Sequence, residues 1–302
     1  MASFTKEIKD EVTKIENNKL ESIAEVNGYL LLNSNIINNR LVIYVENASV
    51  ARRLFSLIKR IYNINIYLTI RTQKRFTVKT IYILEIVDKV DFILKDIDDM
   101  KNHILSYSDE ERASFIKGCF LASGSINDPS KSKYHLDIFA KEEEVANIIN
   151  KTLQSFDFSS KVIKREKEYM IYIKAAEDIA DFIKLIGAIN SLFYYEDIRI
   201  YRDHKNMVNR LNNCEQANVE KSMKTCREQV ENIEYLQNND MLMLLDDKVR
   251  LVADYRLKYP ETTMQELADI ISMETDYEIT KSGINHHFRK IKDLVNKAKD
   301  KE

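Results

Sequence analysis

The first 200 residues contain the same order of apolar and polar positions twice. In each copy, runs rich in Ile, Val and Tyr predict strands, and apolar side chains three or four positions apart predict helices. The first copy, at about 20–105, has predicted strands at 41–45, 65–71 and 78–87 and a helix at 48–62. The second copy, at about 109–187, has predicted strands at 134–140, 160–165 and 169–174 and helices at 142–155 and 176–187. The pattern predicts an α+β fold with a duplicated αββαββα unit.

Each copy opens with a helix that carries glycine in an otherwise apolar face. Residues 24–34 read AEVNGYLLLNS and residues 114–124 read SFIKGCFLASG, so Gly28 and Gly118 lie 90 residues apart. Because glycine has no side chain, two such helices can pack backbone against backbone. This arrangement resembles the seam of LAGLIDADG homing endonucleases, which form a saddle over DNA. Residues 1–200 are therefore predicted to form one degenerate LAGLIDADG-type domain, preceded by a short helix at 3–16.

A different pattern follows residue 200. Residues 205–237 contain neither Pro nor Gly, and we predict a long linker helix at 201–239. A narrow apolar stripe runs along it, formed by Val219, Met223, Cys226, Val230 and Ile233. The stripe fits either a coiled coil or a helix that lies on a neighbouring domain. Its two heptads are fewer than a coiled coil needs, which favours the second interpretation.

Residues 240–302 predict a compact three-helix domain. Its first helix ends before Pro260, Thr263 and Glu266 fit a capping box for the second, and Thr280 fits the N-cap of the third. The third helix buries a stripe of Ile284, Phe288, Ile291 and Leu294 or Val295. The pattern is typical of a helix-turn-helix domain, with the motif at about 263–296, although other small three-helix domains share it.

Composition limits the classes of protein that fit. The formal net charge is −2, so evidence for nucleic-acid binding has to come from local charge. Three scattered cysteines are too few for a disulfide framework or a zinc site. No apolar stretch fits a signal peptide or a membrane span, and we expect a cytoplasmic protein with no membrane partner.

The third helix of the C-terminal domain carries the clearest candidate chemistry. Its polar face suits the major groove of double-stranded DNA, because Arg can bind guanine and Asn can bind adenine through paired hydrogen bonds. The alternative is a basic helix that is merely solvated. The predicted DNA-binding residues are Lys281, Ser282, Asn285, His286, Arg289 and Lys290. The adjacent His286 and His287 cannot easily share a metal, and for both we expect groove contact or solvent exposure.

Basic residues also occur on corresponding strands of the two repeats. Cations on a curved sheet could contact phosphates and position a duplex without reading its sequence. The predicted phosphate contacts are Arg71, Lys74, Arg75, Lys79, Lys164 and Arg165. The alternative is that these strand cations are solvated.

The residues at the ends of the two seam helices argue against catalysis. A LAGLIDADG nuclease has one metal-binding carboxylate near the end of each seam helix. The corresponding positions here hold Asn33 and Ser123, which carry no negative charge for a hard cation. We therefore predict no catalytic residues, no metal and no cofactor. The alternative is a metal-dependent LAGLIDADG endonuclease.

Four separated motifs, in order, give the chain a resemblance to one family. They read ENASVARRLF at 46–55, KGCFLASGS at 117–125, NRLNNCEQAN at 209–218 and KSGINH at 281–286. The combination resembles the WhiA family of bacterial regulators of sporulation and cell division. Two departures are His287, where the family usually has Arg, and Leu32-Asn33-Ser34 in place of a small, glycine-containing end.

The resemblance implies a non-enzymatic DNA-binding protein that acts through its helix-turn-helix domain. It implies a role in transcription, cell division, chromosome segregation or sporulation, and a place on the nucleoid. Transcription or division proteins are further expected partners. A third reading stays open, in which the saddle is a protein-interaction scaffold and the C-terminal domain is an accessory DNA-binding unit.

Overall fold

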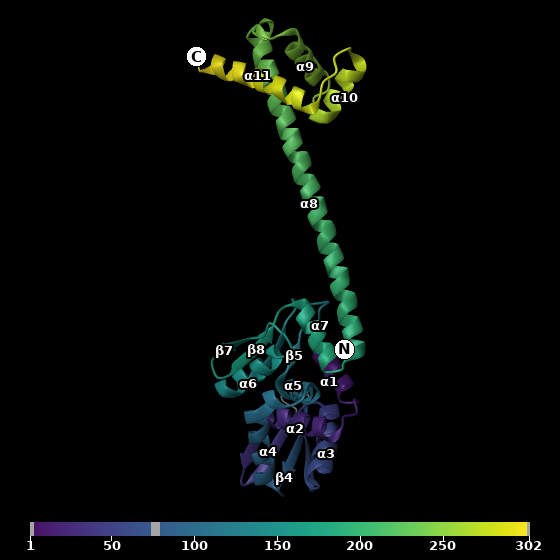
Figure 1. Ribbon diagram of the computed structural model, residues 1–302, viewed down its shortest axis with the longest axis vertical. Coiled ribbons are helices and arrows are strands. Elements are labelled where there is room, and N and C mark those ends of the chain that lie inside the picture. The colour runs from purple at the N-terminus through teal and green to yellow at the C-terminus, as the bar shows by residue number, and fades with distance from the viewer. Residues whose placement is uncertain (1–2, 74–78, 301–302) are drawn as a thin grey trace. The chain divides into compact units, whose positions relative to one another are not determined.

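The computed structural model describes residues 3–73 and 79–300 of the chain (Figure 1). These residues form two compact units, residues 1–203 and residues 204–302. Each unit has its own hydrophobic core.

Unit 1 contains the predicted duplication. The first repeat comprises α2 (Lys19–Asn33), β1 (Asn35–Ile37), β2 (Arg40–Val45), α3 (Ala48–Tyr62), β3 (Ile66–Gln73), β4 (Lys79–Ile86) and α4 (Val90–His103). The second comprises α5 (Asp109–Ser123), β5 (Ser125–Ile126), β6 (Leu136–Ala140), α6 (Glu143–Gln154), β7 (Lys161–Lys164), β8 (Tyr169–Ile173) and α7 (Ala176–Leu185). The α+β class and the αββαββα repeat are confirmed. The short strands β1 and β5 are the first strands of the two repeats, and no bounds were predicted for them.

The two sheets have the same topology. Both are antiparallel, with strand orders β1-β2-β4-β3 and β5-β6-β8-β7. Strand side chains alternate between faces, so Leu41, Ile43 and Val45 of β2 all point into the core, where they are buried. One face of each sheet is therefore covered by helices, and the opposite face is called the open face below.

Helices α2 and α5 form the seam between the repeats and lie side by side (Figure 1). An ideal Cβ on Gly28 would lie 2.2 Å from the carbonyl oxygen of Phe115. A Cβ on Gly118 would lie 2.0 Å from the carbonyl oxygen of Glu25. Both distances are far below van der Waals contact, so the two helices touch through their backbones, as the glycine pattern predicted.

Helix α1 (Phe4–Val12) ties the start of the chain to the rest of unit 1. Ser3 is its N-cap, and Phe4, Ile8 and Val12 are buried. The carboxylate of Glu11 accepts hydrogen bonds from the backbone N–H groups of Asn190 and Ser191, at 2.6 and 3.0 Å. Glu11 thereby satisfies the first amides of helix α8 (Ile189–Asn238). That helix therefore begins at Ile189, well before the predicted start at residue 201. The earlier start could not be predicted because the capping residue lies on a distant segment.

Unit 2 is a three-helix domain that packs on the last turns of α8. Its helices are α9 (Asp247–Lys258), α10 (Met264–Glu274) and α11 (Lys281–Lys299). Cys226, Ile233 and Leu236 of α8 are buried in this unit, whereas Val219 and Met223 are exposed. The C-terminal part of the predicted stripe thus lies on the neighbouring domain, as the favoured interpretation held.

Candidate nucleic-acid interface

Helix α11 is held by its N-cap and its apolar face. The hydroxyl of Thr280 accepts a hydrogen bond from the backbone N–H of Gly283, and Thr263 and Glu266 form the predicted capping box of α10. Ile284, Phe288 and Ile291 are buried in the core of unit 2. The opposite face of α11 is consequently fixed in its orientation and exposed.

The structure places the predicted DNA-binding residues on this exposed part of α11. Five of them are exposed and Asn285 is half-buried; the five are Lys281, Ser282, His286, Arg289 and Lys290. No residue in the first turn of α11 is acidic. Lys290 lies 3.4 Å from Asp246 at the start of α9, but both side chains remain largely exposed. The surface therefore combines positive charge with side chains that can read base edges.

His287 is not a groove-facing residue, and our expectation for it was wrong. It is buried, and its Nε2 lies 3.0 Å from the hydroxyl of Tyr277 in the turn before α11. Burial, with the nearby charges of Lys290, His286 and Lys248, lowers the pKa of His287. The side chain lies on the flank of the buried stripe, where it joins α11 to the turn.

Arg256 is a structural residue that the sequence reading missed. It is fully buried, and its Nη1 donates hydrogen bonds to the backbone oxygens of Tyr259 and Thr262, at 3.2 and 2.6 Å. Its guanidinium also lies 5.5 Å from the centre of the Phe288 ring in α11. Burial lowers its pKa. A signal was present, because position 256 follows Val249, Val252 and Ala253 on the helical apolar spacing.

The strand cations are only partly described. Lys74 and Arg75 lie outside the described residues, as does the side chain of Lys79. Arg71 is exposed on β3. Lys164 pairs with Tyr169 in register, with its ammonium 5.8 Å from the centre of that ring. Arg165 is exposed in the turn after β7. Contact of these cations with phosphates stays a prediction.

Asn33 and Ser123 have structural roles at the ends of the seam helices. The amide of Asn33 donates hydrogen bonds to the Tyr29 hydroxyl and to the backbone oxygen of Tyr44 in β2, both at 3.0 Å. The hydroxyl of Ser123 donates to the backbone oxygen of Phe139 in β6 at 2.7 Å and accepts from its N–H at 3.1 Å. Each side chain therefore joins its seam helix to its own sheet.

A lysine lies near the end of the second seam helix. The ammonium of Lys9 donates a hydrogen bond to the backbone oxygen of Leu121 at 3.1 Å. Burial lowers the pKa of Lys9 to about 8, and the charge of Asp137 opposes that shift. Its position at the negative end of α5 is favourable for a cation.

Within residues 3–73 and 79–300, no group of three or more His, Cys, Asp or Glu side chains could hold a metal ion.

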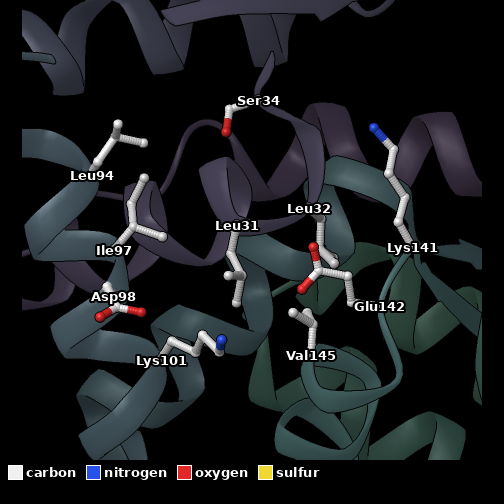
Figure 2. A pocket seen from close by; sticks show the side chains of 10 residues that line it. All are labelled: Leu31, Leu32, Ser34, Leu94, Ile97, Asp98, Lys101, Lys141, Glu142 and Val145. Atoms are coloured by element: carbon white, nitrogen blue, oxygen red, sulfur yellow. The ribbon is translucent and has the colours of Figure 1, made fainter. Parts of the chain in front are cut away.

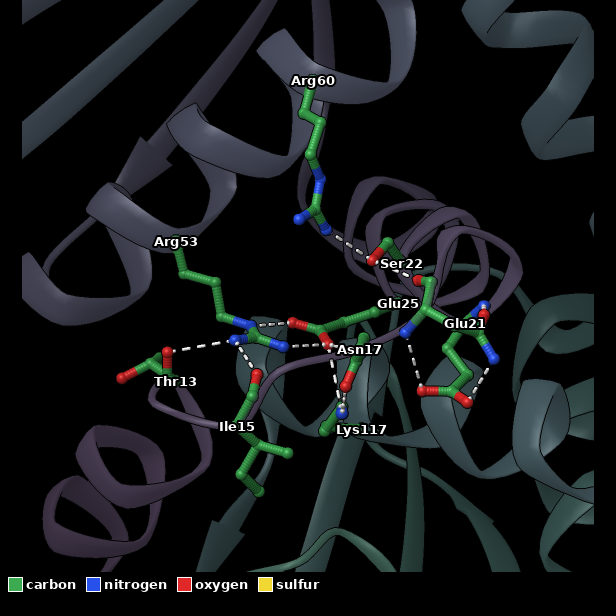
Figure 3. Close-up of polar contacts among 10 residues, drawn as sticks. Thr13, Ile15, Asn17, Glu21, Ser22, Glu25, Arg53, Arg60 and Lys117 are labelled. Carbon is green, nitrogen blue, oxygen red and sulfur yellow. Dashed lines mark hydrogen bonds and ion pairs between the residues drawn. The ribbon is translucent and has the colours of Figure 1, made fainter.

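A buried polar network flanks the seam (Figure 3). The carboxylate of Glu25 on α2 is fully buried, where it pairs with Arg53 of α3 and, at 3.2 Å, with Lys117 of α5. Arg53 also donates hydrogen bonds to the backbone oxygens of Thr13 and Ile15, at 3.0 and 2.7 Å. The network joins both repeats and the segment before α2, and Figure 3 shows Arg53 and Lys117 reaching the Glu25 carboxylate.

A pocket of about 280 Å³ lies between the two repeats (Figure 2). Its lining includes Leu31, Leu32, Leu94, Ile97 and Val145, which are aliphatic. Ser34 and four charged residues, Asp98, Lys101, Lys141 and Glu142, complete the lining. Because two acids balance two lysines, the pocket offers no net charge for a phosphate, and we assign it no part in DNA binding.

Comparison with known families identifies both units. Residues 19–98 match the domain family described as "WhiA N-terminal LAGLIDADG-like domain", and residues 112–205 match the family described as "WhiA LAGLIDADG-like domain". The description "WhiA C-terminal HTH domain" matches residues 208–295. The chain belongs to the WhiA family. The match of two saddle halves and one helix-turn-helix domain confirms the resemblance seen in the sequence.

Relatives match over nearly the whole chain. The chain is 38% identical to the "Probable cell division protein WhiA" of Enterococcus faecalis, over 99% of each chain. It is 39% identical to the protein of the same name from Bacillus cytotoxicus, over 98% of this chain and 97% of that one. The crystal structure of full-length WhiA from Thermotoga maritima is similar in fold, with a TM-score of 0.59 and 24% identity over 98% of this chain and 99% of that one.

None of the helices described in residues 3–73 and 79–300 combines the length and the apolar character that crossing a bilayer requires.

Proposed function

We propose that the protein binds double-stranded DNA through α11 and acts as a non-enzymatic transcriptional regulator. The observation that supports this proposal most directly is the exposed basic face of α11. The opposite face of the helix packs in the core of unit 2, which fixes the orientation of the basic face. Relatives named for cell division support a role in that process. Chromosome segregation and sporulation are included in the proposal as further processes that such a regulator could control. A regulator of this kind works on the nucleoid, in the cytoplasm.

Residues of the exposed face divide between base and phosphate contacts in this proposal. Arg289, with Ser282 and Asn285 one or two turns earlier, suits base edges, since these side chains form hydrogen bonds with defined geometry. Lys281, Lys290 and His286 suit phosphates, which position the domain without reading sequence. On the saddle, Arg71, Lys74, Arg75, Lys79, Lys164 and Arg165 are proposed as accessory phosphate contacts.

The decisive experiment compares two cations on one helix. Arg289→Ala should weaken binding to a specific site by roughly 1–3 kcal/mol if Arg289 reads guanine. Lys299→Ala is the matched control, because its ammonium lies 4.9 Å from the centre of the Tyr235 ring, away from the proposed groove face. Sites would be found by mapping genome-wide occupancy and measured by fluorescence anisotropy. Equal affinities of both variants and the unmodified protein on every site would refute the proposal.

The rival function is metal-dependent cleavage of DNA by the saddle. We propose that the saddle is inactive, because Asn33 and Ser123 bond to their own sheets and carry no charge for a metal. Incubation of the purified chain with duplex DNA in Mg²⁺ or Mn²⁺ tests this. Metal-dependent nicking that disappears when the seam-helix ends are changed would establish the rival.

A further inference from the structure

Strand β3 is the outer strand of its sheet, and its edge is unusually apolar. It pairs with β4 on one side, and the strand order places no described strand on the other. The side chains of Tyr67, Leu68 and Ile70 are 62%, 49% and 59% exposed. An edge with unpaired backbone groups and apolar side chains is a template for a further strand.

The second repeat provides an internal comparison. The corresponding edge strand, β7, spans only Lys161–Lys164, and a lysine stands at each end of it. Short length and lysine are two devices that protect sheet edges from pairing. Strand β3 is eight residues long and has one charged residue, Arg71. Of the two corresponding edge strands, β7 is therefore protected from pairing and β3 is open to it.

We propose that β3 pairs antiparallel with β3 of a second copy of this chain, with Thr69 on the two-fold axis. In this register Leu68 lies opposite Ile70 of the second copy, and Arg71 lies opposite Tyr67. Arg71 and Tyr67 both lie on the open face, whereas Leu68 and Ile70 both lie on the face that β2 turns towards the core.

The pairing is chemically self-complementary. The two apolar side chains cover one another on one face, and the guanidinium of Arg71 meets an aromatic ring on the other. No like charges face each other, because β3 carries no other charged residue. A dimer would carry two helix-turn-helix units, which can bind two half-sites of one duplex. The assembly extends the proposed function but does not depend on it.

Disulfide trapping tests the register in the full chain without DNA. The background is Cys214→Ser, which removes the exposed free thiol. Residues directly opposite in an antiparallel pair have Cα atoms about 4.5–5.5 Å apart, within the range of a disulfide. Thr69→Cys should therefore cross-link with itself, and Leu68→Cys should cross-link with Ile70→Cys. Leu68→Cys alone should not cross-link, because position 68 of the second copy lies two residues further along the strand. The two Cα atoms at position 68 are then about 8 Å apart, beyond the reach of a disulfide.

Ile163→Cys, on the protected edge β7, is the matched control and should remain uncross-linked. Sedimentation velocity should show the mass of the unmodified chain rising towards that of two chains with concentration. Leu68→Lys with Ile70→Lys should weaken this association roughly tenfold or more. A chain that stays monomeric, or cross-links equally through Ile163→Cys, or forms no Thr69→Cys disulfide, overturns the proposal. DNA binding by such a monomer would leave the proposed function intact.

Discussion

The backbone of Gly118 lies so close to Glu25 that a methyl group on Gly118 would stand 2.0 Å from the Glu25 carbonyl oxygen. Gly28 has the same relation to Phe115, at 2.2 Å. Since each obstacle is backbone, neither clash can be relieved by a rotating side chain. The two glycines therefore fix the distance between the repeats.

Replacing either glycine with alanine should destabilise unit 1. We expect Gly118→Ala to lower its free energy of unfolding by about 2–3 kcal/mol or more, because the seam helices must move apart. Urea unfolding followed by circular dichroism measures the change. Leu20→Ala, at the exposed start of α2, is the control and should alter stability by less than about 0.5 kcal/mol. A stable Gly118→Ala variant would show that the seam can relax.

The charge of Glu25 should matter more than that of Lys117. Glu25→Gln leaves Arg53 and Lys117 buried without their anion, and we expect a loss of about 3–5 kcal/mol. Lys117→Met leaves the Arg53–Glu25 pair in place, and burial already lowers the pKa of Lys117, so its loss should be below about 2 kcal/mol. The same urea experiment ranks the two variants. The reverse ranking would show that Lys117 holds the network together.

Much of this fold could be predicted because its signals are local. The bounds of α3, the capping box at Thr263 and the N-cap at Thr280 follow from side chains within a few residues of each element. The glycine seam could be predicted because both copies of the repeated unit carry a glycine in the apolar face of their first helix. The start of α8 could not, because its cap, Glu11, lies far away in sequence.

The candidate site was predictable to a similar extent. The polar face of α11 follows from its period, but the burial of His287 depends on Tyr277, which belongs to the preceding turn. Asn33 and Ser123 could be recognised as uncharged. Their hydrogen bonds to Tyr44 and Phe139 could not be predicted, because they depend on where each sheet lies beside its seam helix.

Restoring an acid at the first seam-helix end should destabilise the saddle. In Asn33→Asp, a carboxylate replaces the amide that donates to the Tyr44 carbonyl, so two acceptors face each other. We expect a loss of about 1 kcal/mol, the lower end of the cost of an unsatisfied polar group, because Asn33 is only half-buried. Asn33→Ala is the comparison, since it removes the donor without adding charge and should cost less. Greater stability of Asn33→Asp in Mg²⁺ would indicate a retained metal site.

The stability of unit 2 should depend on the protonation of His287. Its pKa is lowered in the folded state, so near pH 6 the unfolded chain binds more protons and unfolding becomes easier as pH falls. Stability should be constant above the ordinary histidine pKa of about 6.5 and decline between about pH 6.5 and 5. His287→Gln should remove this part of the decline, and the exposed His286→Gln should not. Thermal melts across this range give the comparison, and identical profiles for all three proteins would contradict it.

Salt dependence separates the two proposed sets of DNA contacts. Each phosphate neutralised by a cation releases counterions, and the logarithm of affinity falls with that of salt by about 0.9 per contact. Replacing Lys74, Arg75, Lys164 and Arg165 with Gln should flatten this slope if the saddle holds phosphates, while the preferred sequence stays the same. Arg71 is left unchanged because it lies in the proposed β3 contact. Lys281→Gln should flatten the slope independently, since it belongs to α11. A saddle variant with the slope of the unmodified chain, beside a reduced slope for Lys281→Gln, would restrict DNA contact to unit 2.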